Sequence, residues 1–306
     1  MKNYEQTLLE MMAADERIVV MTAENRAAIR NLPNLAPDRF IDTGITEQTM
    51  VGAAAGLALR GRVPILHALA TFLTLRAFEF VRTDVGIGNL PVKLVGGVPG
   101  FLSDGNGPTH QAIEDVSLMR GIPGFHVFCP ADEEDLVLGL PAIVNSPYPT
   151  YIRHNALKPP AGIEHAPFEI GRAEQLSNGD DVAILVYGFL LREAWDAKSR
   201  LEAEGVSVRV INVRMPKPID VEAVLNAARE TSLLVTLEDH FLTGGLFSIV
   251  SEALVRHGAT AGVLPIALEE RWFKPALLPD VLRYEGFTGE QIAARILERL
   301  PVRAQH

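Results

Sequence analysis

Short runs of β-branched and apolar residues alternate with helix-length segments along the first part of the chain. The strand-like runs lie at residues 17–21, 39–42, 64–66, 92–95, 126–128 and 150–153. The helix-length segments lie at residues 47–59, 72–85, 109–120 and 132–144. Strands that are separated by helices form βαβ units, in which helices cover both faces of a parallel sheet. The alternation therefore predicts an α/β fold with a mainly parallel sheet flanked by helices.

The alternation stops after residue 153 and resumes near residue 171. The segment between contains Pro159-Pro160-Ala161-Gly162 and has no helical or strand periodicity, which is typical of a linker. Strand-like and helical segments return at residues 182–186, 190–204, 206–213, 233–237 and 244–257. We therefore predict a first domain over residues 1–158, a linker over residues 159–170, and a second, smaller α/β domain over residues 171–306.

Charge and apolar content argue against two classes of partner. The 306 residues carry a formal net charge of −10, whereas a nucleic-acid surface needs clustered basic side chains. The longest apolar stretch, residues 182–191, is about half of the length that spans a bilayer. The first residues lack the apolar core of a signal peptide, and the single cysteine, Cys129, fits a reducing compartment. We expect a cytoplasmic protein that binds neither nucleic acid nor a membrane.

Glu47 places a carboxylate where ligands bind in folds of this kind. It follows the strand-like run that ends at Asp42, and Gly44 between them allows the backbone to turn. Ligands of parallel sheets bind beyond the carboxyl ends of the strands. A glutamate in the first turn of a helix also interacts favourably with the helix dipole, so the position alone leaves both roles open. The small residues of segment 52–58 suit close packing against another helix, within the chain or across a subunit interface.

Several motifs, in their order and spacing, resemble those of transketolases. Gly44-Ile45-Thr46-Glu47-Gln48 is similar to the Gly-Ile-Ala/Thr-Glu-Gln signature of transketolases and of deoxyxylulose phosphate synthase. The resemblance continues through Ala70-Thr71-Phe72-Leu73, Asn106-Gly107-Pro108-Thr109-His110-Gln111, Cys129-Pro130-Ala131-Asp132 and Glu238-Asp239-His240. It covers essentially the whole chain. It implies a pyrimidine-binding domain followed by a transketolase C-terminal domain.

The resemblance implies that Glu47 activates thiamine diphosphate. In this family the matching glutamate hydrogen-bonds N1′ of the aminopyrimidine and favours the tautomer that removes the C2 proton of the thiazolium. This is the work of a positioned acid–base group in a pocket that excludes water. Phe72 matches the aromatic residue that stacks on the pyrimidine ring. We also assign Leu75, Phe78, Ile45 and Glu24 to the cofactor site. Leu75 replaces an aromatic residue of the family. For Phe78, core packing is an equal alternative.

Three residues match positions that contact the sugar substrate in this family. His110 matches the histidine that faces the hydroxyls of the donor sugar, and we predict that it is catalytic together with Glu47. Asn106 stands where larger transketolases carry an aspartate. Arg153 resembles the arginine that holds the substrate's phosphate, a contact that suits the fork of guanidinium donors. The rest of the phosphate pocket departs from the family, with alanine at position 28 and valine at position 98. The sequence therefore does not decide whether the substrate carries a phosphate or another anion.

The half of a transketolase that binds the cofactor's diphosphate has no counterpart in this sequence. That half carries a Gly-Asp-Gly motif and a downstream asparagine, and Mg²⁺ prefers such oxygen ligands together with phosphate. No histidine of this chain shows metal-ligand spacing, so we expect no metal held by this chain alone. We therefore predict a partner, an N-terminal transketolase subunit that binds the diphosphate and Mg²⁺, and an assembly of the α2β2 type.

The predicted function is that of the small subunit of a split transketolase, which transfers a two-carbon ketol unit between sugars or sugar phosphates and is active only with its partner. The β subunit of a 2-oxo acid dehydrogenase and a deoxyxylulose phosphate synthase-like enzyme are alternatives that share the cofactor. A non-catalytic α/β subunit is a third alternative, against which the presence of Glu47, Phe72 and His110 argues. A nucleotide-binding Rossmann protein is disfavoured, because no Gly-x-Gly-x-x-Gly follows the first strand-like run.

Overall fold

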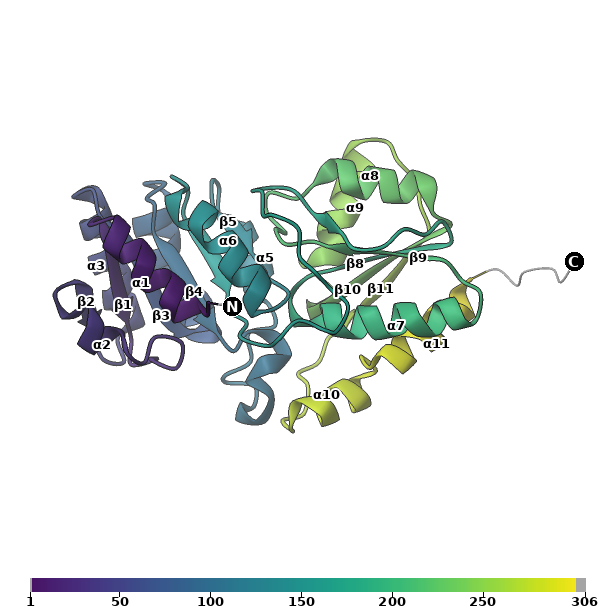
Figure 1. Ribbon diagram of the computed structural model, residues 1–306, viewed down its shortest axis with the longest axis horizontal. Coiled ribbons are helices and arrows are strands. Elements are labelled where there is room, and N and C mark those ends of the chain that lie inside the picture. The colour runs from purple at the N-terminus through teal and green to yellow at the C-terminus, as the bar shows by residue number, and fades with distance from the viewer. Residues whose placement is uncertain (1, 301–306) are drawn as a thin grey trace, which may run out of the picture.

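The computed structural model describes residues 2–300 and shows two α/β domains side by side (Figure 1). Residues 301–306 of the predicted second domain lie outside the described part of the chain. The first domain is built on a six-stranded sheet in which all neighbouring strands are parallel. Its strands, in spatial order, are β2 (Phe40–Asp42), β1 (Ile18–Thr22), β3 (Val63–Leu69), β4 (Lys93–Gly97), β6 (Thr150–Arg153) and β5 (His126–Phe128). The predicted α/β class is confirmed.

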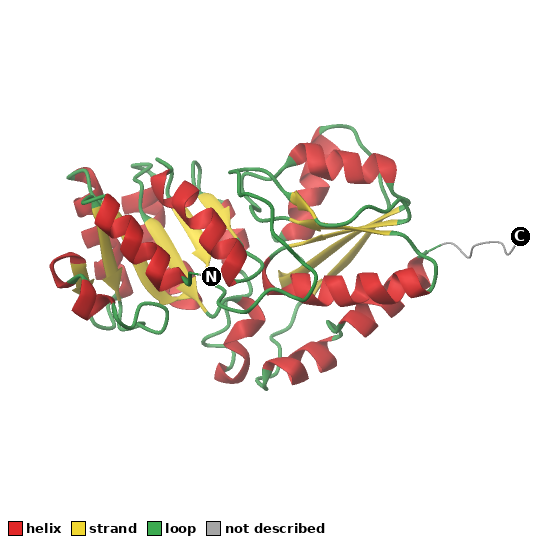
Figure 2. Cartoon of the chain, in the orientation of Figure 1, coloured by secondary structure: helices red, strands yellow, loops and turns green. Residues whose placement is uncertain are grey.

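Helices cover both faces of this sheet (Figure 2). On one face, α1 (Tyr4–Ala14) and α6 (Glu133–Asn145) pack on the strands through Leu8, Met12 and Leu140. On the other face lie α3 (Glu47–Leu59), the helical segment 72–86 and α5 (Asp115–Arg120). A short helix, α2 (Leu32–Leu35), lies between β1 and β2. Because the sheet is covered twice, every residue of β1 is buried, as is usual for an inner parallel strand.

Segment 72–86 differs from the single α-helix that the sequence predicts. It consists of two π-helical stretches, Phe72–Arg76 and Val81–Gly86, with the short helix α4 (Phe78–Phe80) between them. Its buried residues Leu73, Ala77, Val81 and Val85 recur at every fourth position. In a regular α-helix every fourth residue is offset by about 40°, so this spacing would drift around the helix. The wider π turns remove the drift and keep all four side chains on the sheet.

The helix predicted over residues 109–120 begins only at Asp115. Residues before it form a turn, in which the His110 backbone N–H donates to the Gly107 carbonyl and Gly107 adopts a φ of 85°. The Ile113 carbonyl accepts from the Phe241 backbone N–H of the second domain. The backbone groups that a helix would use are thus taken by the turn and by the domain contact, and His110 lies on this turn.

The second domain contains a five-stranded mixed sheet flanked by helices. Its strands, in spatial order, are β11 (Val263–Leu268), β10 (Leu233–Phe241), β8 (Val182–Val186), β9 (Val208–Asn212) and β7 (Glu174–Gln175). Only β7 runs antiparallel to its neighbour among these described strands. Its helices are α7 (Leu191–Ala203), α8 (Val221–Glu230), α9 (Leu246–Arg256), α10 (Leu278–Glu285) and α11 (Gly289–Arg299). None of the helices within residues 2–300 has the length and apolar content of a membrane span.

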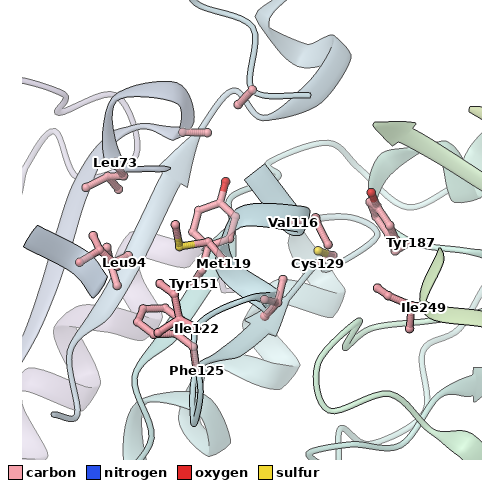
Figure 3. Packing of buried hydrophobic residues seen from close by; sticks show 14 of the residues in the cluster. Leu73, Leu94, Val116, Met119, Ile122, Phe125, Cys129, Tyr151, Tyr187 and Ile249 are labelled. Atoms are coloured by element: carbon pink, nitrogen blue, oxygen red, sulfur yellow. The ribbon is translucent and has the colours of Figure 1, made fainter. Parts of the chain in front are cut away.

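One hydrophobic core continues from the first domain into the second. Figure 3 shows side chains of this core from Leu73 and Leu94, through Met119, Phe125 and Tyr151, to Tyr187 and Ile249. Cys129 is fully buried in the same cluster, and burial raises the pKa of its thiol. The shared core fixes the two sheets relative to each other.

The linker is held to both domains by buried charges. The His165 ring bonds Asp132 of the first domain through Nε2 at 2.8 Å and Glu174 of the second domain through Nδ1 at 2.8 Å. Arg214 lies 2.7 Å from Asp135 and 2.9 Å from Glu174. Both nitrogens of His165 face carboxylates, so the protonated ring satisfies both contacts at once. Two cations and three carboxylates thus form one buried network that joins the linker to the two domains.

The stability of the chain is expected to fall as pH rises from about 6.5 to about 10, in part through His165. Burial would lower the pKa of His165, but the hydrogen bonds to Asp132 and Glu174 outweigh burial and raise the pKa to about 10. A proton bound more tightly in the folded state stabilises it fully below the ordinary pKa of 6.5, and this contribution is lost through the folded pKa. Denaturant unfolding at a series of pH values should show this loss, and His165→Gln should flatten it. An identical pH slope for both proteins would contradict the prediction.

Candidate active site

A tight turn after β2 positions Glu47. The Gly44 backbone has a φ of 67°, a conformation that favours glycine, and its N–H donates to the Asp42 side chain at 2.9 Å. Thr46 closes the turn by donating from its hydroxyl to the Thr43 carbonyl at 2.8 Å. Glu47 is then the first residue of α3, and it is only 2% exposed. A buried carboxylate without water needs a partner, so its contacts define the site.

Arg76 contacts both Glu47 and Phe72. Arg76 Nη1 lies 3.1 Å from Glu47 Oε2. The Cζ atom of the same guanidinium lies 4.0 Å from the centroid of the Phe72 ring, within the range of a cation–π contact. Phe72 begins the first π-helical stretch, and Arg76 ends it. The two residues are four apart on a helical segment, so their side chains meet on one face.

His110 approaches the same group from the turn before α5. Its ring packs edge-on against Phe72, with centroids 5.2 Å apart and an interplanar angle of 66°. Thr109 Oγ1 bonds His110 Nδ1 at 2.9 Å, which holds the ring in place. The structure therefore brings together Glu47, Phe72 and His110, three residues that the sequence assigns to one site. It adds Arg76, whose only sequence signal is its spacing from Phe72.

A hollow of about 540 Å³ opens beside this group at the carboxyl edge of the sheet. Glu47, Phe72, Ile45 and Glu24 all line this hollow, which we call the Glu47 hollow. Ile45 is 67% exposed, which is unusual for a large apolar side chain and suits a surface that a ligand or another chain covers. Arg26, Arg30 and Asn25 also line the hollow, so its walls are mixed polar and apolar. A buried carboxylate beside an aromatic ring fits a flat, nitrogen-bearing ring such as an aminopyrimidine.

Two other residues predicted for the cofactor site lie apart from the Glu47 hollow. Leu75 is 40% exposed and does not line the hollow. Phe78 is partly buried and packs against the core that the two domains share. Leu75 adds an exposed apolar side chain to the same helical segment, whereas Phe78 fills space under it.

Arg153 is buried and is paired with carboxylates of both domains. It ends β6, and its guanidinium pairs with Asp115 at 2.9 Å through Nε and with Asp239 of the second domain at 2.6 Å through Nη1. The side chain is 3% exposed, and the Tyr187 ring lies 5.2 Å from Cζ. The structure does not bring Arg153 to Glu47 or His110. These contacts give Arg153 a structural role between the domains, and its contact with a substrate's phosphate stays a prediction.

The Gly-rich loop before His110 begins at Gly100, which packs against the ion pair of Arg153 and Asp239. Gly100 has a φ of 56°, and a Cβ atom there would lie 1.7 Å from Asp239 Oδ2. Asn106, at the end of this loop, is exposed, and its side chain has no hydrogen bond among the described residues. The loop is therefore anchored at its start, and Asn106 stays free to meet a ligand.

A second hollow, of about 520 Å³, adjoins the first and shares Asn25, Ala27 and Leu69 with it. Tyr4, His67 and His154 line it, and Tyr4 Oη bonds His67 Nε2 at 2.8 Å. Burial lowers the pKa of His67 to about 3 and that of His154 to about 4, so both rings are neutral near pH 7. Its described lining contains two glutamates and neither lysine nor arginine. We call it the distal hollow.

Asp135, His165 and Glu174 lie close enough together to hold a metal ion, a cluster that sequence reasoning missed because its members are far apart in the chain. Both ring nitrogens of His165 already bond carboxylates, and Arg214 supplies a positive charge to Asp135 and Glu174. The cluster is thus balanced by the protein's own cations. A further hollow, of about 720 Å³, lies at the ends of β10 and β11, and its described lining contains none of the candidate residues.

Family models match nearly the whole chain. The model of the transketolase pyrimidine binding domain matches residues 1–158, and that of the transketolase C-terminal domain matches residues 171–292. A 6-deoxy-6-sulfo-D-fructose transketolase subunit of Clostridium sp. (strain MSTE9) is 40% identical over 82% of this chain and 79% of its own length. A putative transketolase C-terminal section of Methanocaldococcus jannaschii is 31% identical over 98% of this chain and 95% of its own.

Longer relatives match over part of their length. The 1-deoxy-D-xylulose-5-phosphate synthase of Thermomicrobium roseum is 38% identical over 95% of this chain, which spans 47% of that enzyme. Among solved structures, a split-gene transketolase described as an inactive β4 tetramer superimposes with a TM-score of 0.89, at 32% identity and with 98% of both chains covered. A transketolase of Pichia stipitis, at 18% identity, shares the fold, with a TM-score of 0.76 over 96% of this chain and 44% of its own.

Proposed function

The chain belongs to the transketolase family, and we propose that within it the chain is the pyrimidine-binding subunit of a two-chain, thiamine diphosphate-dependent enzyme. The reaction is the transfer of a two-carbon ketol unit between sugars. One observation carries the proposal: the buried carboxylate of Glu47 lines the same hollow as Phe72, at the carboxyl edge of a parallel sheet. That arrangement supports a site for an aminopyrimidine ring.

Each residue of the group has a role that its position supports. Glu47 shares one proton with the ring's N1′: as a carboxylic acid it would donate to N1′, and as a carboxylate it would accept from the protonated N1′–H. Phe72 stacks on the ring, and Ile45 and Glu24 border it. His110 faces the sugar's hydroxyl groups from the turn beside Phe72, and Asn106 lies on the same loop. When bound, thiamine diphosphate supplies the nucleophilic carbon that takes up the ketol unit.

The proposed partner supplies the other half of the site. The Glu47 hollow offers a buried carboxylate and the Phe72 ring to a flat ring, whereas Mg²⁺ on a diphosphate needs a set of oxygen ligands of its own. We propose an N-terminal transketolase subunit that holds the diphosphate and Mg²⁺, in an α2β2 assembly. The relatives described as a transketolase subunit and as a split-gene transketolase support this division of the site between two chains.

The distal hollow supports a donor sugar whose far end is not a phosphate. A phosphate monoester carries about −1.5 to −2 charges at pH 7 and binds best to arginine or lysine. The described lining of the distal hollow offers neutral donors from Tyr4, His67 and His154 together with Glu5 and Glu133. A hydroxyl or a singly charged sulfonate suits these donors better. The relative that acts on 6-deoxy-6-sulfo-D-fructose supports a sulfonate.

Reconstitution with a partner tests the proposal. The purified chain is mixed with a transketolase N-terminal subunit that carries Gly-Asp-Gly and a downstream Asn, with thiamine diphosphate and Mg²⁺. We expect ketol transfer from the mixture and none from either chain alone. Fructose, fructose 6-phosphate and 6-deoxy-6-sulfo-fructose serve as matched donors, and kcat/KM is expected to be lowest for the phosphate.

Three results would count against parts of the proposal. Full activity of the chain without a partner would contradict the two-chain site. Pyruvate-dependent decarboxylation by the mixture would favour the 2-oxo acid dehydrogenase or deoxyxylulose phosphate synthase alternatives. A kcat/KM that is highest for fructose 6-phosphate would contradict the assignment of the distal hollow and leave the two-chain site unaffected.

A further inference from the structure

Arg76 makes the two contacts that the proposed function assigns to the cofactor's aminopyrimidine ring. Its Nη1 atom lies 3.1 Å from Glu47 Oε2, where a ring nitrogen would bond the carboxylate. Its guanidinium lies over Phe72, with Cζ 4.0 Å from the ring centroid, where a stacked ring would lie.

A guanidinium is chemically suited to stand in for such a ring. It is flat and delocalised, it stacks on aromatic faces, and it donates N–H groups to carboxylates. An aminopyrimidine is also flat and meets a carboxylate through nitrogen. A distance of 4.0 Å is a stacking distance, so no further flat group fits between Arg76 and that face of Phe72. The guanidinium and the ring therefore compete for Glu47 and for this face.

We propose that Arg76 is a placeholder that holds Glu47 and covers Phe72 until the aminopyrimidine displaces it; this rests on the proposed function. The arginine side chain is 41% exposed, whereas that of Glu47 is 2% exposed. A displaced guanidinium can therefore return to water, but Glu47 cannot. In the free chain, loss of Arg76 leaves a buried carboxylate without a charged partner, which is costly. Arg76 is thus a positioning residue for Glu47.

If Arg76 is a placeholder, its loss should weaken folding of the free chain and tighten binding of the cofactor. Arg76→Ala removes the partner of Glu47, so the melting temperature of the free chain falls. It also removes a competitor, so the dissociation constant of thiamine diphosphate for the assembled enzyme falls as well, which is tighter binding. A structural arginine would lower stability and weaken binding together. An arginine that holds the cofactor would weaken binding.

The experiment measures both quantities for wild type, Arg76→Ala, Arg76→Lys and a matched control. The control is Arg82→Ala, which removes an exposed arginine of the same helical segment that has no ion pair among the described residues. Melting is measured on the free chain. Binding of thiamine diphosphate with Mg²⁺ is measured by titration calorimetry on the complex with the N-terminal subunit.

For Arg76→Ala we expect a lower melting temperature and a dissociation constant reduced by about three- to tenfold. Arg76→Lys keeps the charge for Glu47 but loses the flat stack, so its binding constant falls between those of wild type and Arg76→Ala. Arg82→Ala changes neither quantity. An unchanged or larger dissociation constant for Arg76→Ala, with wild type binding normally, overturns the placeholder alone. Absence of cofactor binding by the wild-type complex overturns the proposed function and the placeholder together.

Discussion

Replacing Glu47 by glutamine is expected to lower the turnover of the assembled enzyme by about 10²–10⁴-fold and to leave the chain folded. Glutamine has nearly the same shape and keeps an acceptor for Arg76, whose Nη1 lies 3.1 Å away. It cannot take or return the proton that the aminopyrimidine exchanges with a carboxylate. The substitution therefore removes the proton transfer and preserves the packing at the start of α3.

Two readouts separate this loss from a general defect. The rate of C2 proton exchange of bound thiamine diphosphate should fall together with turnover, whereas the dissociation constant of the cofactor should change much less. Glu79→Gln is a matched control, because Glu79 is an exposed glutamate in the helical segment that carries Phe72. Near-normal turnover of Glu47→Gln, in a complex that binds the cofactor, would remove Glu47 from the mechanism.

Local sequence patterns predicted those parts of the fold that depend on neighbours in the chain. The helix from Glu47 to Leu59 and the strand at residues 150–153 have the predicted bounds. The prediction of one α-helix over residues 72–85 was wrong. The buried residues of this segment recur at every fourth position, a spacing that π turns accommodate. Helices α1, α2, α8, α10 and α11 and strands β7 and β11 are additional elements that the sequence did not predict.

The site shows the same division between local and distant information. Glu47, Phe72 and His110 belong to motifs, and the structure brings them together. Arg76 carries no motif, and only the approach of one helical segment to the start of α3 reveals its contact with Glu47. The partners of Arg153 lie 38 and 86 residues away, so sequence spacing could not reveal that its guanidinium is already paired. A motif identifies a residue, whereas the contacts of that residue in the fold decide its role.

Arg153→Leu is expected to lower the free energy of unfolding by about 3–5 kcal/mol, because it leaves two buried carboxylates without their cation. Arg153 Nε lies 2.9 Å from Asp115, and Nη1 lies 2.6 Å from Asp239 of the second domain. Tyr151 Oη donates to Asp115 at 2.6 Å but carries no charge to balance it. Denaturant unfolding of the free chain measures the loss, and Arg82→Leu, at an exposed position, should change it little.

A second substitution distinguishes this structural role from a contact with substrate. Arg153→Leu combined with Asp239→Asn removes one cation and one of its carboxylates together, so it should recover part of the lost stability.

If Arg153 instead holds the substrate's phosphate, Arg153→Lys should raise KM for phosphorylated donors and leave stability unchanged. The structure predicts the reverse, because a lysine ammonium cannot meet Asp115 and Asp239 with the geometry of the guanidinium fork. Arg153→Lys should therefore destabilise the contact between the domains, and any change in KM relative to wild type should be similar for charged and uncharged sugars.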